Sequence, residues 1–367
     1  MAPIRILHMI GSFNIGGSQT MVLNLYREMD REKIQFDFIL DHPAERELAH
    51  QAESLGAKIY TVPAFTGTNI GQVRKAWDKL FTEHPEYRIL HSHVRSYASV
   101  YLPVARKHGV KTIIHSHSTS NGKGIKAFAK AVMQYPLRFL ADYYFSCSEE
   151  AGRWLFGKQI ATGDRHYIIK NAINAAAYRM NDTVRAAYIQ ELGLSGKRVY
   201  AHVGRFHPAK NHEFLLRTFQ KIHHVQPDAV LMLIGDGELR ESIVQQIEKL
   251  GIRDAVLLLG SRHDIPKLLQ AADVFLFPSV WEGLGIVAVE AQAAGLPCIC
   301  SDRVPTLVKI TDYCRFLPLE EDTWVEAATR SEFRREDFYD RIVAAGYDVR
   351  TTVQWLRDFY EGLWKEC

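Results

Sequence analysis

The chain carries the stretch VFLFPSVWEGLGIVAVEA at residues 274–291. Its first four residues are apolar and a proline follows them, which predicts a short buried strand. Two glycines then loosen the turn, and an alanine-rich apolar run predicts a helix from about residue 284 to residue 294. A strand followed by a helix is the repeating pair of an α/β fold.

Glu282 and Glu290 stand in this stretch with seven residues between them. Eight helical positions rise about 12 Å, so one carboxylate would flank the helix start and the other would lie two turns along. A helix N-terminus favours anions, because its N–H groups are unpaired. The spacing would therefore suit a sugar, a diphosphate and a ribose in a row. The alternative, a helix cap and a solvated face, is disfavoured because a carboxylate in so apolar a helix needs a polar partner.

Composition bounds the class of protein. At 367 residues the chain is long enough for two domains, and its net charge of +3 is too weakly basic to indicate nucleic acid as a partner. The apolar run at 4–10 is too short for a signal segment, and no apolar run approaches the roughly 18 residues that span a bilayer. No CxxC pair occurs, which predicts reduced thiols and a cytoplasmic protein. The cysteines are Cys147, Cys298, Cys300, Cys314 and Cys367.

Short apolar runs alternate with helical-period segments along almost the whole chain, which predicts stacked βαβ units and parallel sheets. We expect strands near 4–10, 35–40, 58–62, 88–91, 111–115, 143–147, 166–170, 198–203, 229–234, 255–259, 273–277, 297–300 and 314–317. The segment from 171 to 196 is the expected crossing between two Rossmann-like domains. A terminal helix with an apolar stripe is expected from about residue 348 to residue 365.

Ligands of open α/β sheets bind outside the carboxyl ends of strands, so the loops there are candidate sites. The first loop brings Gly16 and Gly17 to a helix start, where backbone can approach a phosphate closely. It is not GxGxxG and no GxxxxGK[ST] occurs, which disfavours an NAD site and excludes a P-loop. Arg205 and Lys210 follow a later strand and suit a diphosphate. The plain alternatives are a tight turn and two solvated cations.

Histidines cluster after two further strands, in His91-Ser92-His93 and in His115-Ser116-His117. Alternation places His115 and His117 on one face of their strand. Paired histidines can bind metal, but no carboxylate or cysteine completes a site nearby, so we predict no metal site. We favour one histidine as a hydrogen-bond donor to substrate and the others as structural. The loop 235–238 is either a nucleotide-side turn or a plain one.

A basic amphipathic stretch covers residues 123–140, where Lys123, Lys126 and Lys130 alternate with apolar side chains. Such a pattern is typical of a helix that binds a membrane surface. The alternative is an ordinary helix packed on the sheet.

Together these motifs resemble the family-4 (group 1) retaining glycosyltransferases of the GT-B fold, above all their exopolysaccharide and capsule branch. The resemblance covers nearly the whole chain. It rests on Ile15-Gly16-Gly17-Ser18, His115-Ser116-His117-Ser118-Thr119, Val203-Gly204-Arg205-Phe206 with Lys210, Gly235-Asp236-Gly237-Glu238, Asp273 through Ser279, and Glu282 through Pro297.

The resemblance implies an α/β GT-B architecture, in which two Rossmann-like domains turn their parallel sheets toward a central cleft. Residues 1–172 would form the acceptor-side domain and residues 173–345 the nucleotide-sugar domain. Residues 346–367 would form a helix that packs back toward the first domain.

The resemblance also implies residue roles. Glu290 would bind the donor ribose and Glu282 the donor sugar, while Arg205 and Lys210 would hold the diphosphate. The remaining donor-side residues would be Gly16, Gly17, Gly283, Leu284 and Gly285. His117 would meet the sugar or the acceptor, which makes Glu282, Arg205, Lys210 and His117 the candidate catalytic residues.

We therefore expect a retaining hexosyltransferase that moves sugar from a nucleotide-sugar, with UDP favoured, to a lipid-linked or oligosaccharide acceptor of cell-surface polysaccharide. It would work in the cytoplasm, peripherally at the inner face of the plasma membrane. No Asp-x-Asp and no nucleophile and acid/base carboxylate pair are evident, so we expect metal-independent transfer without a cofactor. The alternatives are a UDP-sugar epimerase of the same architecture and a non-catalytic sugar-nucleotide-binding protein. The intact set of Glu282, Glu290, Arg205 and Lys210 argues against lost activity.

Overall fold

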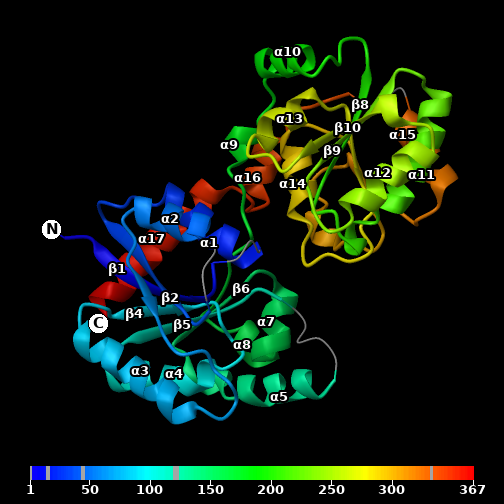
Figure 1. Cartoon of the computed structure of the whole chain (residues 1–367). Helices are drawn as coiled ribbons and strands as arrows, with labels where there is room; N and C mark the ends of the chain where they lie inside the picture. The colour runs from blue at the N-terminus through cyan, green and yellow to red at the C-terminus, as the bar shows by residue number, and fades with distance from the viewer. Residues whose placement is uncertain (1, 14–16, 43–45, 119–123, 331–333) are drawn as a thin grey trace. The chain divides into compact units, whose positions relative to one another are not determined.

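The computed structural model describes residues 2–13, 17–42, 46–118, 124–330 and 334–367. The chain folds as two units, each built on its own sheet (Figure 1). Unit 1 comprises residues 1–172 and 349–367, and unit 2 comprises residues 173–348.

Unit 1 contains a parallel sheet in the order β3-β2-β1-β4-β5-β6-β7. Its chain order reverses between β1 and β4, which makes their carboxyl ends the switch point of the sheet. The strands are β1 (Ile4–Gly11), β2 (Ile34–Leu40), β3 (Ile59–Thr61), β4 (Ile89–Ser92), β5 (Lys111–Ser116), β6 (Tyr143–Ser146) and β7 (His166–Ile168). The helices are α1 (Gly17–Glu28), α2 (Arg46–Ser54), α3 (Ile70–Glu83), α4 (Ala98–Lys107), α5 (Ile125–Gln134), α6 (Leu137–Leu140), α7 (Glu149–Phe156) and α8 (Lys158–Ala161).

The terminal helix α17 (Val349–Lys365) completes unit 1 and packs against α1. Its stripe of Val349, Val353, Leu356, Tyr360 and Leu363 is buried in the same core as the inner faces of β1 and β2. The predicted return of the terminal helix to the first domain is confirmed.

Unit 2 contains a parallel sheet in the order β10-β9-β8-β11-β12-β13, with its switch point between β8 and β11. The strands are β8 (Arg198–Val203), β9 (Ala229–Ile234), β10 (Val256–Gly260), β11 (Val274–Phe277), β12 (Cys298–Ser301) and β13 (Cys314–Leu317). The helices are α9 (Ala175–Tyr178), α10 (Asp182–Glu191), α11 (His212–Val225), α12 (Arg240–Lys249), α13 (Ile265–Ala271), α14 (Ile286–Ala293), α15 (Glu321–Thr329) and α16 (Tyr339–Ala344), with 3-10 turns η1 (Pro208–Lys210), η2 (Arg253–Ala255) and η3 (Thr306–Val308).

The predicted fold class, two Rossmann-like domains with parallel sheets, is confirmed. Each expected strand is present. A short apolar run between two turns, as in the fully buried β9, is the pattern of a buried parallel strand. The segment that follows Ile173 is not a free crossing, since α9 and α10 pack on α13 within unit 2.

The helix that follows β11 differs from the prediction. It begins at Ile286 rather than near residue 284, because Gly285 has a left-handed conformation with φ of +85°. Glu282 therefore lies in the loop ahead of α14, and only Glu290 lies on the helix.

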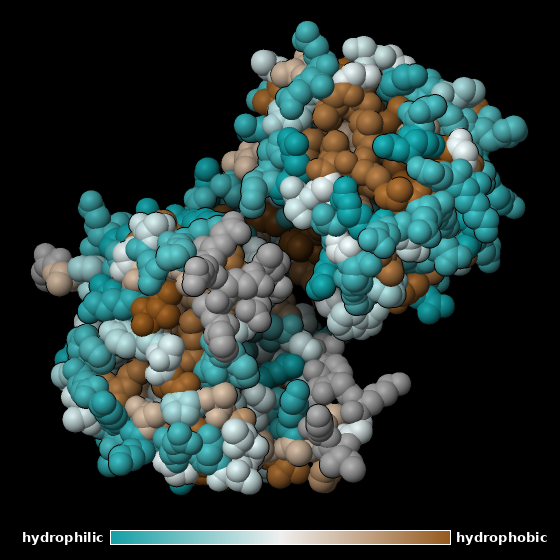
Figure 2. All heavy atoms as spheres, in the orientation of Figure 1, coloured by the Kyte–Doolittle hydropathy of each residue, from teal (hydrophilic) through white to brown (hydrophobic). Residues whose placement is uncertain are grey.

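The surface is largely hydrophilic, and apolar residues in view gather in separate patches (Figure 2). Among the described residues, no helix combines the length and the apolar character needed to cross a bilayer.

Candidate active site

The switch point of unit 2 brings two loops together, one after β8 and one after β11. Lys210 Nζ lies 2.6 Å from Glu282 Oε1, and these side chains are only 18% and 12% exposed. The Val280 N–H donates to the Ala209 carbonyl at 2.8 Å, which joins the two loops through the backbone. Lys210 Nζ also lies 5.1 Å from the centre of the Phe277 ring. A cation and a carboxylate are thus held in place at the carboxyl end of the sheet.

The loop after β8 is shaped by close packing. The Phe206 side chain is buried, and its N–H donates to the Asp236 carbonyl at 2.9 Å. A Cβ on Gly235 would lie 2.1 Å from the Gly204 carbonyl oxygen, so only glycine fits there. The loop 235–238, for which two interpretations were open, supports the backbone that carries Arg205 and Lys210.

Arg205 and Lys210 share this loop but differ in environment. The Arg205 side chain is 72% exposed, and its Nε lies 3.2 Å from Glu238 Oε2. Such an exposed pair is weak and readily exchanged, so Arg205 is free to meet a ligand.

Two buried histidines, His202 and His212, lie close enough to Lys210 to feel its charge. Burial and the charge of Lys210 lower the pKa of His212 to about 4, and burial is the main cause of the lowered pKa of His202. Both rings are therefore neutral near pH 7, and Lys210 supplies the positive charge at this point.

The turn before α14 depends on one of its two glycines. A Cβ on Gly285 would lie 3.0 Å from Phe277 Cε1, whereas a Cβ on Gly283 would meet nothing within 4 Å. Leu284, between them, packs against the core of unit 2.

Glu290 is the partly buried carboxylate of α14. Burial raises its pKa, and the Tyr178 hydroxyl and the charge of Lys210 offset this only in part. Burial also raises the pKa of Tyr178, so its hydroxyl remains a donor toward Glu290. Within the described part of the chain, no lysine or arginine forms an ion pair with Glu290. The carboxylate thus retains acceptor capacity for the hydroxyls of a ligand.

Sequence reasoning missed Tyr178. It lies on α9, in the segment interpreted as the crossing, and no motif marks it. Only the folding of that segment onto unit 2 brings it to Glu290.

The candidate residues of unit 1 lie after β1 and β5. Gly17 begins α1, while Gly16 lies outside the described residues. His117 follows β5, and its Nε2 lies 2.8 Å from His93 Nδ1. Burial, with a smaller effect of Arg95, lowers the pKa of His117 to about 3. His117 is therefore a neutral group near pH 7, and its role toward the substrate stays a prediction.

Comparisons with known proteins match both halves of the chain. The family model described as Glycosyltransferase Family 4 matches residues 15–177, and that described as Glycosyl transferases group 1 matches residues 184–313. EpsF of Bacillus subtilis strain 168, which is named as a glycosyltransferase, is 32% identical over 97% of this chain and 96% of its own length. The chain belongs to the group 1, family 4 glycosyltransferases. The predicted family and glycosyltransferase activity are thereby confirmed.

Two further matches to this glycosyltransferase have lower identity. The UDP-Gal:alpha-D-GlcNAc-diphosphoundecaprenol alpha-1,3-galactosyltransferase of Escherichia coli is 27% identical over 59% of this chain and 58% of its own length. The crystal structure of Anabaena Alr3699/HepE in complex with UDP matches with a TM-score of 0.79 at 18% identity, over 98% of this chain and all of that one. That structure confirms the fold.

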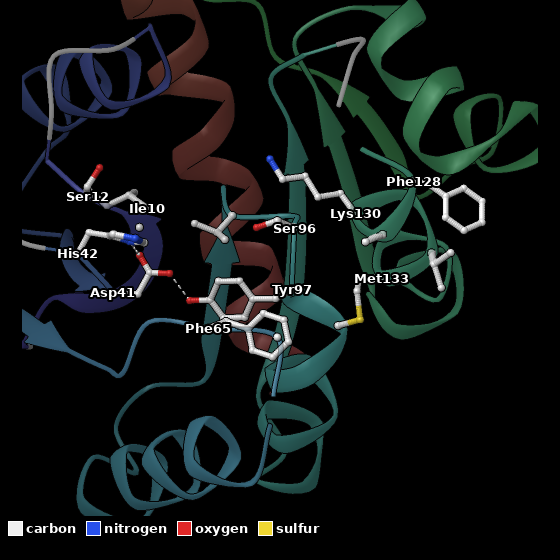
Figure 3. Close-up of a pocket in the computed structure, with 15 residues that line it drawn as sticks. Ile10, Ser12, Asp41, His42, Phe65, Ser96, Tyr97, Phe128, Lys130 and Met133 are labelled. Atoms are coloured by element: carbon white, nitrogen blue, oxygen red, sulfur yellow. Dashed lines mark hydrogen bonds and ion pairs between the residues drawn. The ribbon is translucent and has the colours of Figure 1, made fainter. Parts of the chain in front are cut away.

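A glycosyltransferase also needs a place for its acceptor, and unit 1 contains a cavity of about 780 Å³ beside the ends of β1 and β2. Figure 3 shows Asp41, His42 and Ser12 on one side of it, with Lys130 and Met133 of α5 on the other. Phe65 and Tyr97 stack with ring centres 5.3 Å apart and form part of its wall. The mixture of polar and apolar side chains in its lining suits an amphipathic ligand.

Proposed function

We propose that this glycosyltransferase moves a hexose from a UDP-sugar to a lipid-linked acceptor in the biosynthesis of exopolysaccharide or capsule. The observation that carries the proposal is the convergence of Lys210, Glu282, Arg205 and Glu290 at the switch point of unit 2. The UDP complex of the structurally similar HepE and the UDP-Gal donor in the name of the Escherichia coli relative support UDP as the leaving group.

Each donor-side residue receives a role that its environment suits. The partly buried Glu290, whose carboxylate lacks an ion pair among the described residues, accepts hydrogen bonds from the ribose hydroxyls. Arg205 and Lys210 bind the diphosphate, and the backbone from Gly283 to Gly285 lies beside it at the start of α14. Glu282 binds hydroxyls of the sugar while Lys210 fixes its position.

The proposed transfer retains the configuration of the sugar and needs no metal. The bond from the anomeric carbon to the phosphate oxygen breaks, and the acceptor oxygen forms a new bond on the same face. The acceptor proton passes to the departing phosphate oxygen of UDP. Lys210 and Arg205 stabilise the negative charge that develops on UDP, which is the task of preorganised electrostatics. The paired state of Glu282 favours positioning over nucleophilic attack as its role.

The acceptor is proposed to enter unit 1 through the cavity beside α5. Its walls offer apolar contacts from Phe65, Val132 and Met133, and Lys130 offers a positive charge to a diphosphate. The exposed face of the same region carries Phe128, Val132, Tyr135 and Phe139, each more than half exposed, and Phe128 and Val132 also line the cavity. We propose that this face and the basic residues of the predicted stretch 123–140 hold the enzyme peripherally at the inner face of the plasma membrane. Lys123 lies outside the described residues.

Release of UDP with and without an isoprenoid-diphosphate sugar tests this function. The proposal expects UDP release from at least one UDP-sugar that depends on the acceptor. Release of UDP without acceptor beyond slow hydrolysis, or conversion of the donor to its epimer, would contradict it.

A further inference from the structure

Five imidazoles gather at the carboxyl ends of β1, β4 and β5, which are neighbours in the sheet of unit 1. They form two hydrogen-bonded rows. In one row, His8 Nδ1 lies 3.1 Å from His93 Nε2, and His93 Nδ1 lies 2.8 Å from His117 Nε2. In the other, the Tyr360 hydroxyl lies 2.6 Å from His91 Nδ1, and His91 Nε2 lies 3.2 Å from His115 Nδ1. Of these imidazoles, only His117 is a candidate contact for substrate.

We propose that His93, His115 and His117 form a binding site for one divalent transition-metal ion of the zinc type. One nitrogen of each ring lies within 4.8 Å of the corresponding nitrogens of the other two. Nitrogens bound to one zinc at about 2.0–2.1 Å lie roughly 3.3 Å apart in a tetrahedral site. Small side-chain movements would therefore bring the three nitrogens onto one ion. The third ligand comes from the strand next to β5, which is why the pairing of His115 with His117 did not reveal it in the sequence.

The protonation state of the rings suits a ligand set. Burial is the largest cause of the lowered pKa of each of the three histidines. The rings are therefore neutral near pH 7, and their lone pairs are available without loss of a proton.

The second row and His8 supply outer contacts for two of the three proposed ligands, His115 and His93. A ligating histidine almost always donates its other ring N–H to a fixed partner, which sets its tautomer and orientation. His115 Nδ1 has such a partner in His91, which Tyr360 holds in turn. His93 Nε2 has one in His8.

Two ring nitrogens of the three proposed ligands, His115 Nε2 and His117 Nδ1, are buried and have no hydrogen-bond partner among the described residues. An unpaired buried polar atom is costly, and a bound ion would remove that cost.

The donor atoms and the access favour this site and this class of ion. Imidazole nitrogen suits zinc, copper and nickel, whereas magnesium and calcium require oxygen ligands. His93 and His117 are partly exposed, so an ion can enter and can keep a water ligand. The alternative group of His8, His91 and His93 lies deeper, with two of its three rings fully buried.

The positive charge of Arg95 opposes the binding of a cation at this site. Its guanidinium donates to the Ser118 carbonyl at 2.9 Å and lies 4.8 Å from the centre of the Trp154 ring. These contacts hold it in place, and its effect on the pKa of His117 is second to that of burial.

A bound metal ion would inhibit turnover rather than promote it. His117 is also the proposed substrate contact in unit 1, so an ion and the substrate would compete for it. This consequence rests on the proposed function, but the metal site itself does not.

A titration of the chelator-treated, full-length protein with Co²⁺, in the absence of donor and acceptor, tests the site. We expect one ion per chain, with the intense visible absorption of four- or five-coordinate cobalt, and its loss when Zn²⁺ is added. His93→Gln and His115→Gln should weaken binding at least 100-fold. His50→Gln, which changes an exposed histidine of α2 in the same unit, should bind like wild type.

Thermal unfolding checks that the variants fold, and Tyr360→Phe adds a second test that leaves the three ligands in place. It should weaken Co²⁺ binding by up to about 10-fold, because it releases His91, the outer-shell partner of His115. Absence of tight binding to wild type, or equal binding by the His115→Gln and His50→Gln proteins, would overturn the proposal. UDP affinity measured on the same variants separates this outcome from failure of the proposed function, because UDP is assigned to unit 2.

Discussion

The two glutamates at the switch point of unit 2 have opposite electrostatic environments. Glu282 is neutralised by Lys210 at 2.6 Å. Burial raises the pKa of Glu290, and the contacts of that carboxylate compensate only in part. This contrast is the basis for assigning Glu282 a fixed, oriented position and Glu290 an acceptor site that a ligand completes.

Glu290→Gln should weaken UDP binding about 10-fold. A hydrogen bond to a charged group is worth roughly 1.5–3 kcal/mol and a neutral one roughly 0.5–1.5 kcal/mol, so loss of the charge costs about one factor of ten. Calorimetry of UDP binding measures the effect. Glu248→Gln, at an exposed position of α12, is the matched control and should bind UDP like wild type.

The same substitution makes a prediction for stability against pH. A carboxyl group whose pKa is raised by folding binds more protons in the folded state than in the unfolded state. Its ionisation therefore lowers stability as pH rises from its pKa in the unfolded chain to its pKa in the folded protein. Without ligand, Glu290→Gln should therefore unfold at the same or a higher temperature than wild type at pH 7. Equal UDP affinity in a folded variant, or a marked loss of stability at neutral pH, would contradict the role given to Glu290.

Arg205→Ala should lower kcat by about 10²–10³ without a change in stability. The expected loss is that of one preorganised donor to a developing anion, and the exposed side chain contributes little to folding. Arg240→Ala is a close control, since Arg240 forms an exposed pair with Asp236 near the same loop. Similar kcat values for the Arg205→Ala and Arg240→Ala proteins would show that Arg205 does not stabilise the leaving group.

At the scale of elements, the site depends on how each strand passes into the structure that follows it. The loop after β8 packs closely against the glycines of the loop 235–238. The loop after β11 turns at Gly285 and leads into α14. These turns fix the backbone, so that side chains 72 positions apart, Lys210 and Glu282, meet.

Gly285→Ala should destabilise the protein by about 1–2 kcal/mol, because an alanine at φ of +85° is strained and its Cβ would press on Phe277. Gly283→Ala should change stability by less than about 0.5 kcal/mol, since its Cβ would meet nothing within 4 Å. Denaturant unfolding of both variants measures the difference. Equal stabilities would show that the turn tolerates a side chain at both positions.

Vesicle binding tests the membrane role of α5. Val132→Asp should weaken co-sedimentation with anionic vesicles at least 10-fold, because it removes an apolar contact and adds a repelled charge. Val225→Asp is the matched control, since Val132 and Val225 are 56% and 60% exposed. Wild type and Val225→Asp should co-sediment with these vesicles to the same extent at low salt. If wild type does not bind such vesicles, α5 has no membrane role.

At the scale of the whole molecule, the sequence predicts the secondary-structure elements but not the side-chain contacts between them. Apolar runs bounded by turns locate the strands, since a buried parallel strand needs little else. The start of α14 was misplaced because periodicity does not reveal the left-handed Gly285. The pairing of Lys210 with Glu282, the contact of Tyr178 with Glu290 and the meeting of His93 with His117 each depend on the order of strands or on packing. The residue roles follow from residue chemistry and from the resemblance together, and they stay predictions.

The proposed reaction is retaining transfer from a UDP-sugar in which cationic side chains, and no metal, stabilise the leaving group. The most direct test is the anomeric configuration of the product, determined by NMR after transfer to an isoprenoid-diphosphate sugar in the presence of EDTA. We predict that an α-linked UDP-sugar gives an α-linked product at an undiminished rate. A β-linked product, or loss of turnover that Mg²⁺ or Mn²⁺ restores, would contradict it.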